Sequence, residues 1–364
     1  MKKVGIVTLN GYFNYGNRLQ NYALQEAIEL LGFEAETVLI KRDTTKSVQM
    51  IIFNVLKNIK YKVANNKAEK CMSARIKIFK EFSTHYIAET PYTLSINKDN
   101  RFVNNKYDYF VVGSDQVWNP EMNRTSQTFF LDFAESKKKI AYAPSFGTSE
   151  VPENIKDQYG RWINDIKYLS VREDDGAKII RDLTGREAPV LVDPTLLLSK
   201  EKWLSISKEA SNKPKEKYLL TYFLGGIPDN YRKQISNVVK KNNLKVINLG
   251  DIKEKETYRT GPSEFIDYIN CCSVFCTDSF HGAVFSILLE KPFIVFERQG
   301  LKSTMFSRIN TLLDKFNLEN RKAENICWNE EVFSIDYSGI PKVLETERNK
   351  SFTFLKEALN VKEK

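Results

Sequence analysis

Residues 4–40 decide the fold. They start with VGIVTL at 4–9, continue through the Gly- and Asn-rich stretch NGYFNYGN at 10–17, and end with AETVLI at 35–40. The first run is apolar, which is typical of a strand buried on both faces. Apolar residues then recur at helical spacing, at Leu19, Tyr22, Ala23, Ala27, Leu30 and Leu31. This order predicts a strand, a helix and a parallel second strand, which together form a βαβ unit.

The same rhythm continues along the chain. Further strands are predicted at 107–112, 139–143, 168–172, 218–224, 245–249, 273–277 and 293–296. Helices are predicted at 152–167, 173–183, 229–241, 262–270, 280–289, 302–315 and 342–360, with two basic helices within 47–83 separated by Asn65 and Asn66. The pattern indicates an α/β protein with two Rossmann-like domains facing a cleft. We expect an N-terminal domain at 1–168, which carries a basic helical insertion at 41–83. A C-terminal domain at 169–364 follows, and its last helix is expected to pack back on the first domain.

Composition excludes several classes of protein. Of 364 residues, 42% are hydrophobic and 28% are charged, which excludes a disordered, collagen-like or membrane-embedded chain. No apolar run approaches the roughly 18–20 residues of a membrane-spanning helix. The first residues lack the sustained apolar region of a secretion signal. Five Cys without a C-x-x-C pair favour reduced thiols, so a cytoplasmic location is expected.

Positive charge is concentrated in one segment. The chain holds 55 Lys and Arg against 46 Asp and Glu, and residues 41–80 alone hold eleven basic against two acidic residues. This patch indicates an anionic partner, although a solvated face explains it equally well. Apolar residues at helical spacing from Val48 to Val63 fit a helix lying on an anionic membrane, at its inner face. The alternative is a helix packed on the sheet with its lysines in solvent.

Several common cofactor and metal motifs are absent from the sequence. It has no G-x-x-x-x-G-K-[ST], no G-x-G-x-x-G, no H-E-x-x-H and no D-x-D. With only two His in the chain, a His-based metal centre is not expected either. We therefore expect no metal and no resident cofactor, and no nucleic-acid partner.

The strongest site candidate is TDSFHG at 277–282, between a predicted strand and a predicted helix. Asp278 or Ser279 is a natural N-cap, and the free N–H groups of such a helix start bind phosphate or carboxylate. His281 would stand in the first turn beside that anion, and histidine titrates near neutral pH, which suits proton transfer. The alternative is a capped helix with a structural His. His85 has no such surroundings and is expected to be structural.

Other loops after predicted strands carry polar side chains. In NYGNRLQ at 14–20, Asn17 and Gln20 can bind sugar hydroxyls as donors and acceptors. In GSDQVWN at 113–119, a possible general base, two amides and an aromatic face suit a sugar pocket, whereas an Asx-turn with Trp118 in the core is the alternative. Arg172 can grip an oxyanion, although the acids after it also suit a plain helix start.

Taken together, these motifs resemble the polysaccharide pyruvyl transferase family. The resemblance rests on residues 14–25, 113–119, 170–173, 192–195, 277–282, 291–293 and 307–309, and it spans roughly residues 4–320. It implies a fold similar to GT-B glycosyltransferases with the site in the cleft. It also implies transfer of a pyruvyl unit from phosphoenolpyruvate, the co-substrate, to a sugar or lipid-linked oligosaccharide of a cell-surface polysaccharide. The products are a cyclic ketal and phosphate.

The resemblance also implies roles for individual residues. The expected catalytic residues are His281 and Asp278. The C-terminal side is expected to bind the donor through Arg172, Ser279, Phe280, Gly282, Arg298 and Arg308. The N-terminal side is expected to bind the acceptor through Asn14, Asn17, Gln20, Asp115, Gln116 and Trp118.

One position departs from the family pattern. The family has R-x-H-G where this chain has S-F-H-G, so Ser279 replaces an Arg that contacts the donor. Either Arg298 or Arg308 compensates, or the donor differs. A glycosyltransferase using a nucleotide sugar and a non-catalytic glycan-binding protein remain the alternatives.

Overall fold

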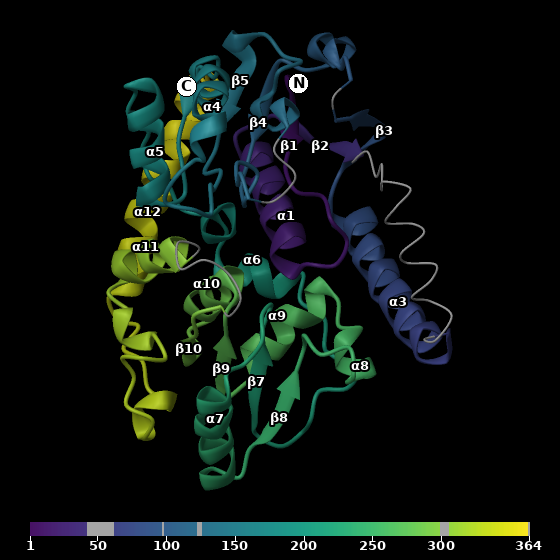
Figure 1. Cartoon of the computed structure of the whole chain (residues 1–364), viewed down its shortest axis with the longest axis vertical. Coiled ribbons are helices and arrows are strands. Elements are labelled where there is room, and N and C mark those ends of the chain that lie inside the picture. The colour runs from purple at the N-terminus through teal and green to yellow at the C-terminus, as the bar shows by residue number, and fades with distance from the viewer. Residues whose placement is uncertain (42–61, 97, 122–125, 299–305, 363–364) are drawn as a thin grey trace.

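Two parallel sheets organise the chain, and the computed structural model describes residues 1–41, 62–96, 98–121, 126–298 and 306–362 (Figure 1). The first sheet holds β1 (Lys3–Val7), β2 (Glu34–Lys41), β3 (Glu89–Ser95), β4 (Tyr109–Val112), β5 (Lys139–Ala141) and β6 (Tyr168–Leu169). Its order is β3-β2-β1-β4-β5-β6, and every pairing is parallel. The order reverses between β1 and β4, where such sheets bind their ligands.

The second sheet has four strands among the described residues. They are β7 (Tyr218–Tyr222), β8 (Lys245–Asn248), β9 (Val274–Thr277) and β10 (Phe293–Val295), in the order β10-β9-β7-β8. All of its pairings are parallel as well, and the order changes direction between β7 and β9. The two Rossmann-like units confirm the α/β class expected from the sequence.

Helix α1 (Tyr15–Leu30) lies between the two sheets (Figure 1). Asn14 caps its amino end by accepting a hydrogen bond from Asn17 N at 3.3 Å. On one side α1 connects β1 with β2, and on the other it packs on α9 (Pro262–Cys271) and α10 (Phe280–Leu288). Tyr15 stacks on Phe265 of α9 with ring centroids 4.2 Å apart. The helix is therefore buried on nearly all sides, as a helix shared by two layers must be.

The remaining α-helices of the described residues are α3 (Lys62–Tyr86), α4 (Lys156–Asn164), α5 (Asp174–Thr184), α6 (Lys200–Ser205), α7 (Asp229–Lys241), α8 (Lys255–Tyr258), α11 (Ser307–Phe316) and α12 (Ile340–Ala358). Of these helices, α4, α5, α7, α11 and α12 lie within about five residues of predicted ones, whereas α6 and α8, like strand β3, were not predicted. The predicted break at Asn65 and Asn66 is wrong, because α3 continues through both residues. The apolar pattern that begins at Val48 falls mostly on 42–61, outside the described residues. None of the described helices has the length and apolar character needed to cross a membrane.

The protein has two halves, the first built on the sheet of β1–β6 and the second on the sheet of β7–β10, and the described chain crosses between them twice. The predicted boundary at residue 168 falls inside β6, which pairs with β5, and α5 packs against α4, so the first sheet and its helices extend to Thr184. At the other end, α12 runs back to the first half, where Phe354 contacts the ring of Tyr142 next to β5. Arg348 of α12 donates to the carbonyl oxygens of Leu196 and Leu198, both at 2.7 Å.

Arg75 of α3 joins the two halves beside the amino end of α1. Its guanidinium donates to Phe13 O at 3.1 and 3.2 Å, to Tyr15 Oη at 3.0 Å and to Tyr258 O at 2.5 Å. It also lies 4.5 Å from the Tyr15 ring centroid and 4.8 Å from that of Phe79. Tyr258 ends α8 in the second half, so this one buried cation connects both halves with the loop before α1.

We expect Arg75→Ala to lower the free energy of unfolding by on the order of 3 kcal/mol. The substitution leaves buried carbonyl and hydroxyl oxygens without a donor, and hydrogen bonds to charged groups are worth about 1.5–3 kcal/mol each. Urea unfolding measures the change. The control is Lys77→Ala on the same helix, whose side chain is 80% exposed and whose loss should change stability by less than about 0.5 kcal/mol. Equal stability of the two variants would contradict the joining role of Arg75.

Candidate active site

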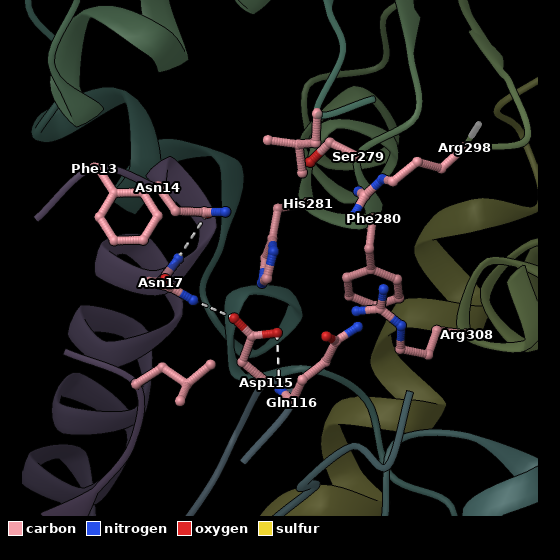
Figure 2. Close-up of a pocket in the computed structure, with 12 residues that line it drawn as sticks. Phe13, Asn14, Asn17, Asp115, Gln116, Ser279, Phe280, His281, Arg298 and Arg308 are labelled. Atoms are coloured by element: carbon pink, nitrogen blue, oxygen red, sulfur yellow. Dashed lines mark hydrogen bonds between the residues drawn. The ribbon is translucent and has the colours of Figure 1, made fainter. Parts of the chain in front are cut away.

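A cavity of about 110 Å³ opens where strands of both sheets end (Figure 2). The first half lines it with Asn14, Asn17, Asp115 and Gln116, and the second half with Ser279, Phe280, His281, Arg298 and Arg308. All nine are residues that the sequence singled out. Leu9, Phe13 and Leu224 also line it and were not predicted. The cavity lies beyond the carboxyl ends of β1, β4, β7, β9 and β10, as expected for ligand sites in parallel sheets.

His281 is held in the first turn of α10. Ser279 caps this helix by accepting a hydrogen bond from Gly282 N at 3.3 Å. A Cβ on Gly282 would stand 2.8 Å from Thr277 Oγ1, so Gly282 lets the helix start approach the end of β9. Gly282 therefore shapes the site without lining the cavity. The imidazole of His281 is 6% exposed and projects into the cavity (Figure 2).

Two neighbours fix the His281 ring, and sequence reasoning assigned a role to neither of them. Nε2 lies 3.4 Å from Oδ2 of Asp193. The other edge lies against α1, so closely that a Cβ on Gly16 would stand 2.1 Å from Nδ1. Only a glycine at position 16 leaves room for the ring. Asp193 lies in the VDPT stretch and Gly16 in the Tyr-Gly-Asn turn, both of which the sequence analysis noted. Neither stretch indicates that its residue contacts His281.

Asp193 is fully buried and is satisfied on both oxygens. Oδ2 accepts from Arg172 Nη1 at 2.5 Å and from Ser114 Oγ at 3.2 Å, while Oδ1 accepts from Thr195 N and Oγ1 at 3.1 and 2.7 Å. Burial alone would raise the pKa of this carboxyl. The positive charges of a protonated His281 and of Arg172 outweigh burial and hold that pKa well below its usual range. Asp193 is therefore a fixed negative charge beside His281.

Arg172 lies behind the cavity, although it was expected to bind the donor. Its guanidinium contacts Asp193 and, at 3.4 Å, Asp115, and it stacks 4.3 Å from the Phe280 ring centroid. Burial opposes its charge, but Asp193 and then Asp115 outweigh burial and raise its pKa. Its two carboxylate partners are therefore residues of this chain and not groups of a donor molecule. In this arrangement Arg172 positions Asp193 and Phe280.

Asn17 and Asp115 bring together the loops after β1 and β4. Asn17 Nδ2 donates to Asp115 Oδ2, and the Asp115 backbone has φ 65°, a left-handed conformation that Asp tolerates. Gln20 is buried behind them, where its Oε1 accepts from Ser114 N at 3.0 Å and its Nε2 donates to Thr8 Oγ1 at 2.8 Å. Burial opposes ionisation of Asp115, yet Arg172, His281 and Arg308 lower its pKa.

Two other predicted site residues lie outside the cavity. Trp118, expected to bind the acceptor, is fully buried in the core, stacks on Phe130 and donates to Phe129 O at 2.9 Å. Asp278, expected to be catalytic, accepts from Leu224 N at 2.7 Å, Gly225 N at 2.8 Å and Arg298 Nε at 3.2 Å. Asp278 thus holds the loop after β7 and orients Arg298.

Arg308 is a buried cation whose contacts with the described residues include no carboxylate within 4 Å. Asp115 and Glu173 act on it only at longer range. With the Gln116 amide oxygen turned toward it, Gln116 accepts from Nη1 at 2.9 Å and Nη2 at 2.6 Å. Burial, and then the charge of Arg172, lower the pKa of Arg308 to about 10. A buried guanidinium in this state favours an anionic ligand. Among the residues described, no cluster of three or more His, Cys, Asp or Glu could hold a metal ion.

The comparisons place this chain in a family. Residues 14–300 match the sequence model described as Polysaccharide pyruvyl transferase. The chain therefore belongs to the polysaccharide pyruvyl transferase family. A search of curated proteins found no match.

Several solved structures are similar over most of the chain. The S. aureus MnaA–UDP co-structure is 12% identical with a TM-score of 0.49, covering 100% of this chain and 98% of that one. The UDP-GlcNAc 2-epimerase of Neisseria meningitidis bound to UDP-GlcNAc is 10% identical with a TM-score of 0.47, covering 97% and 100%. The E. coli ADP-heptose lps heptosyltransferase II is 10% identical with a TM-score of 0.34, covering 96% and 99%.

We expect Gly16→Ala to displace the His281 ring while the protein stays folded, because the added methyl group would overlap Nδ1. The chain has only two His, so ¹⁵N-labelled histidine gives two sets of imidazole signals, and His85→Gln assigns them. The His281 signals should shift in Gly16→Ala. They should not move in Gly226→Ala, since a Cβ there meets nothing within 4 Å. Unchanged His281 signals in Gly16→Ala would contradict the contact.

Proposed function

We propose that this protein transfers the pyruvyl unit of phosphoenolpyruvate to two hydroxyls of one sugar in a cell-surface polysaccharide precursor. The products are a cyclic ketal and phosphate. The observation that carries the proposal is one cavity in which His281, two arginines and a helix start face amides of the opposite half. This arrangement offers anion binding, proton transfer and hydroxyl binding within one small space.

The donor side fits a small molecule with two anionic groups. Arg308 has no carboxylate contact among the described residues, and Arg298 reaches the cavity from beyond β10. At the start of α10, Ser279 Oγ and Ser279 O accept from Gly282 N and Ala283 N, which leaves the N–H groups of Phe280 and His281 for a ligand. Phosphoenolpyruvate brings a phosphate and a carboxylate, so one group can bind the helix start and the other the guanidinium groups.

Another arginine lies close to the position at which the family has an Arg and this chain has Ser279. Ser279 stands at that position and serves as the N-cap of α10. Arg298 Nη2 donates to Asp278 O at 3.1 Å, so its guanidinium contacts the residue directly before Ser279. We infer that Arg298 supplies the charge that the family takes from position 279. This supports phosphoenolpyruvate over a different donor.

The chemistry requires one acid and one base. His281 donates its proton to the methylene carbon of the enol, and the adjacent carbon becomes oxocarbenium-like. A sugar hydroxyl attacks that carbon, and the now neutral His281 accepts the hydroxyl proton. Phosphate then leaves with the electron pair of its C–O bond and takes the proton of the second hydroxyl of the same sugar. The oxygen of that hydroxyl bonds to the same carbon, which closes the ketal. Asp115 is a weak base, since its pKa is lowered, and it instead holds Asn17 toward the acceptor.

Asp193 acts through His281 as a positioning residue. Its Oδ2 lies 3.4 Å from Nε2 of His281 and is itself held by Arg172 and Ser114. The same carboxylate keeps Nε2 from rotating away.

Calorimetry with phosphoenolpyruvate tests the donor. The wild type should bind it, and Arg308→Met should weaken the affinity about 30-fold or more, because losing one partner of a buried charged contact costs about 2 kcal/mol or more. The control is Arg101→Met, whose side chain is 80% exposed and pairs with Asp99. Stabilisation by a nucleotide sugar instead of phosphoenolpyruvate would favour a glycosyltransferase, and binding of neither would reject the assignment.

His281→Ala should lower the turnover of phosphate release by about 10²–10⁴-fold, the usual contribution of a general acid–base group, while phosphoenolpyruvate still binds. His85→Ala is the control, since His85 lies outside the cavity lining. Asp193→Asn should lower turnover and change its pH profile, with a smaller effect on the KM for phosphoenolpyruvate. Near wild-type turnover of His281→Ala would reject its catalytic role.

A further inference from the structure

We propose that Phe13 is the platform on which the acceptor sugar stacks, and that this sugar is a neutral ring. The inference rests on the proposed function and identifies the acceptor side of the same cavity. It starts from the loop before α1, where Phe13 lies next to Asn14 in the lining of the cavity (Figure 2).

Phe13 is an exposed apolar side chain, and it lies at a cavity that a ligand can enter. The described residues include seven large hydrophobic side chains that are exposed, and two of them, Phe13 at 53% and Leu224 at 42%, line this one cavity. Phe13 comes from the first half and Leu224 from the second. An apolar ligand face that enters this cavity would cover both side chains and remove their surface from water.

The backbone of Phe13 is fixed although its ring is in solvent. Its carbonyl oxygen accepts two hydrogen bonds from Arg75, at 3.2 and 3.1 Å. The ring itself lies over Gly11, where a Cβ would stand 2.7 Å from Phe13 Cε1. A rigid aromatic surface that is ordered before the ligand arrives loses little entropy on binding.

The neighbours of Phe13 suit the polar edge of a sugar. Asn14 Oδ1 accepts from Asn17 N, so its Nδ2 can donate to a hydroxyl. Asn17 lies one helical turn further, at its contact with Asp115. The apolar C–H face of a pyranose can therefore pack on the Phe13 ring while its hydroxyls reach the two amides and His281.

Charge decides between a neutral and an acidic sugar. None of the described residues that line the cavity from the first half carries a positive charge, and Asp115 there is ionised. The guanidinium groups of the cavity belong to the second half and face the donor. A uronate carboxylate next to Phe13 would add a second negative charge beside Asp115, whose own charge is already paired with Arg172, so the surface selects a neutral pyranose.

Saturation-transfer NMR tests this without requiring turnover. The probes are methyl β-D-glucopyranoside and methyl β-D-galactopyranoside as neutral rings, and methyl β-D-glucuronide as the acidic one. At least one neutral glycoside should bind more tightly than the glucuronide. Phe13→Ala should weaken it about five-fold or more. Phe13→Tyr should retain binding, and Phe102→Ala, which removes a 58% exposed ring elsewhere, should not change it.

The inference is overturned if Phe13→Ala binds the neutral glycosides as well as Phe102→Ala does. It is also overturned if the glucuronide binds as tightly as the neutral rings, or if no neutral glycoside binds the wild type. Calorimetry with phosphoenolpyruvate on the same variants separates the two proposals. If Phe13-dependent sugar binding appears in a protein that does not bind phosphoenolpyruvate, the sugar platform stands and the donor assignment fails.

Discussion

The carboxylate of Asp193 connects the two halves of the protein behind the cavity. It lies in the segment between the two sheets, and it accepts hydrogen bonds from Ser114 and Arg172 of the first half while facing His281 of the second. A buried carboxylate is costly unless it is paired and hydrogen-bonded, and here both oxygens are satisfied. The position of His281, the stacking of Phe280 on Arg172 and the loop that carries Asp115 all depend on this one charge.

The two halves of the cavity differ in chemistry as they differ in origin. The second half brings cations and the amino end of a helix, whereas the first brings amides and a carboxylate. Ser279 and Arg298 show how the positively charged side is built. A serine caps α10 well, and a side chain from beyond β10 brings positive charge to the same place. Helix capping and positive charge thus come from different residues.

The sequence predicted the elements whose signal is local. The alternation of buried strands and periodic helices placed β1, α1 and β2, and the strand–cap–helix pattern placed His281 at the start of α10. The sequence prediction was wrong or incomplete where contacts between distant residues determine the structure. Asn65 and Asn66 are poor helix formers, but each costs well under 1 kcal/mol, and α3 continues through them. Gly16, Asp193 and the burial of Trp118 depend on partners far away in the chain, which periodicity cannot reveal.

The position of α1 also sets limits on how the chain reaches its folded state. One face of the helix packs on the first sheet. The other packs on α9 and α10, which are synthesised much later. Until then, Tyr15 lacks Phe265 and the space beside Gly16 lacks His281. The first sheet with its helices therefore leaves this face of α1 without its native cover when it is alone. A nascent chain presents an uncovered apolar helix face to the cell until the second half emerges, and chaperones recognise such a surface.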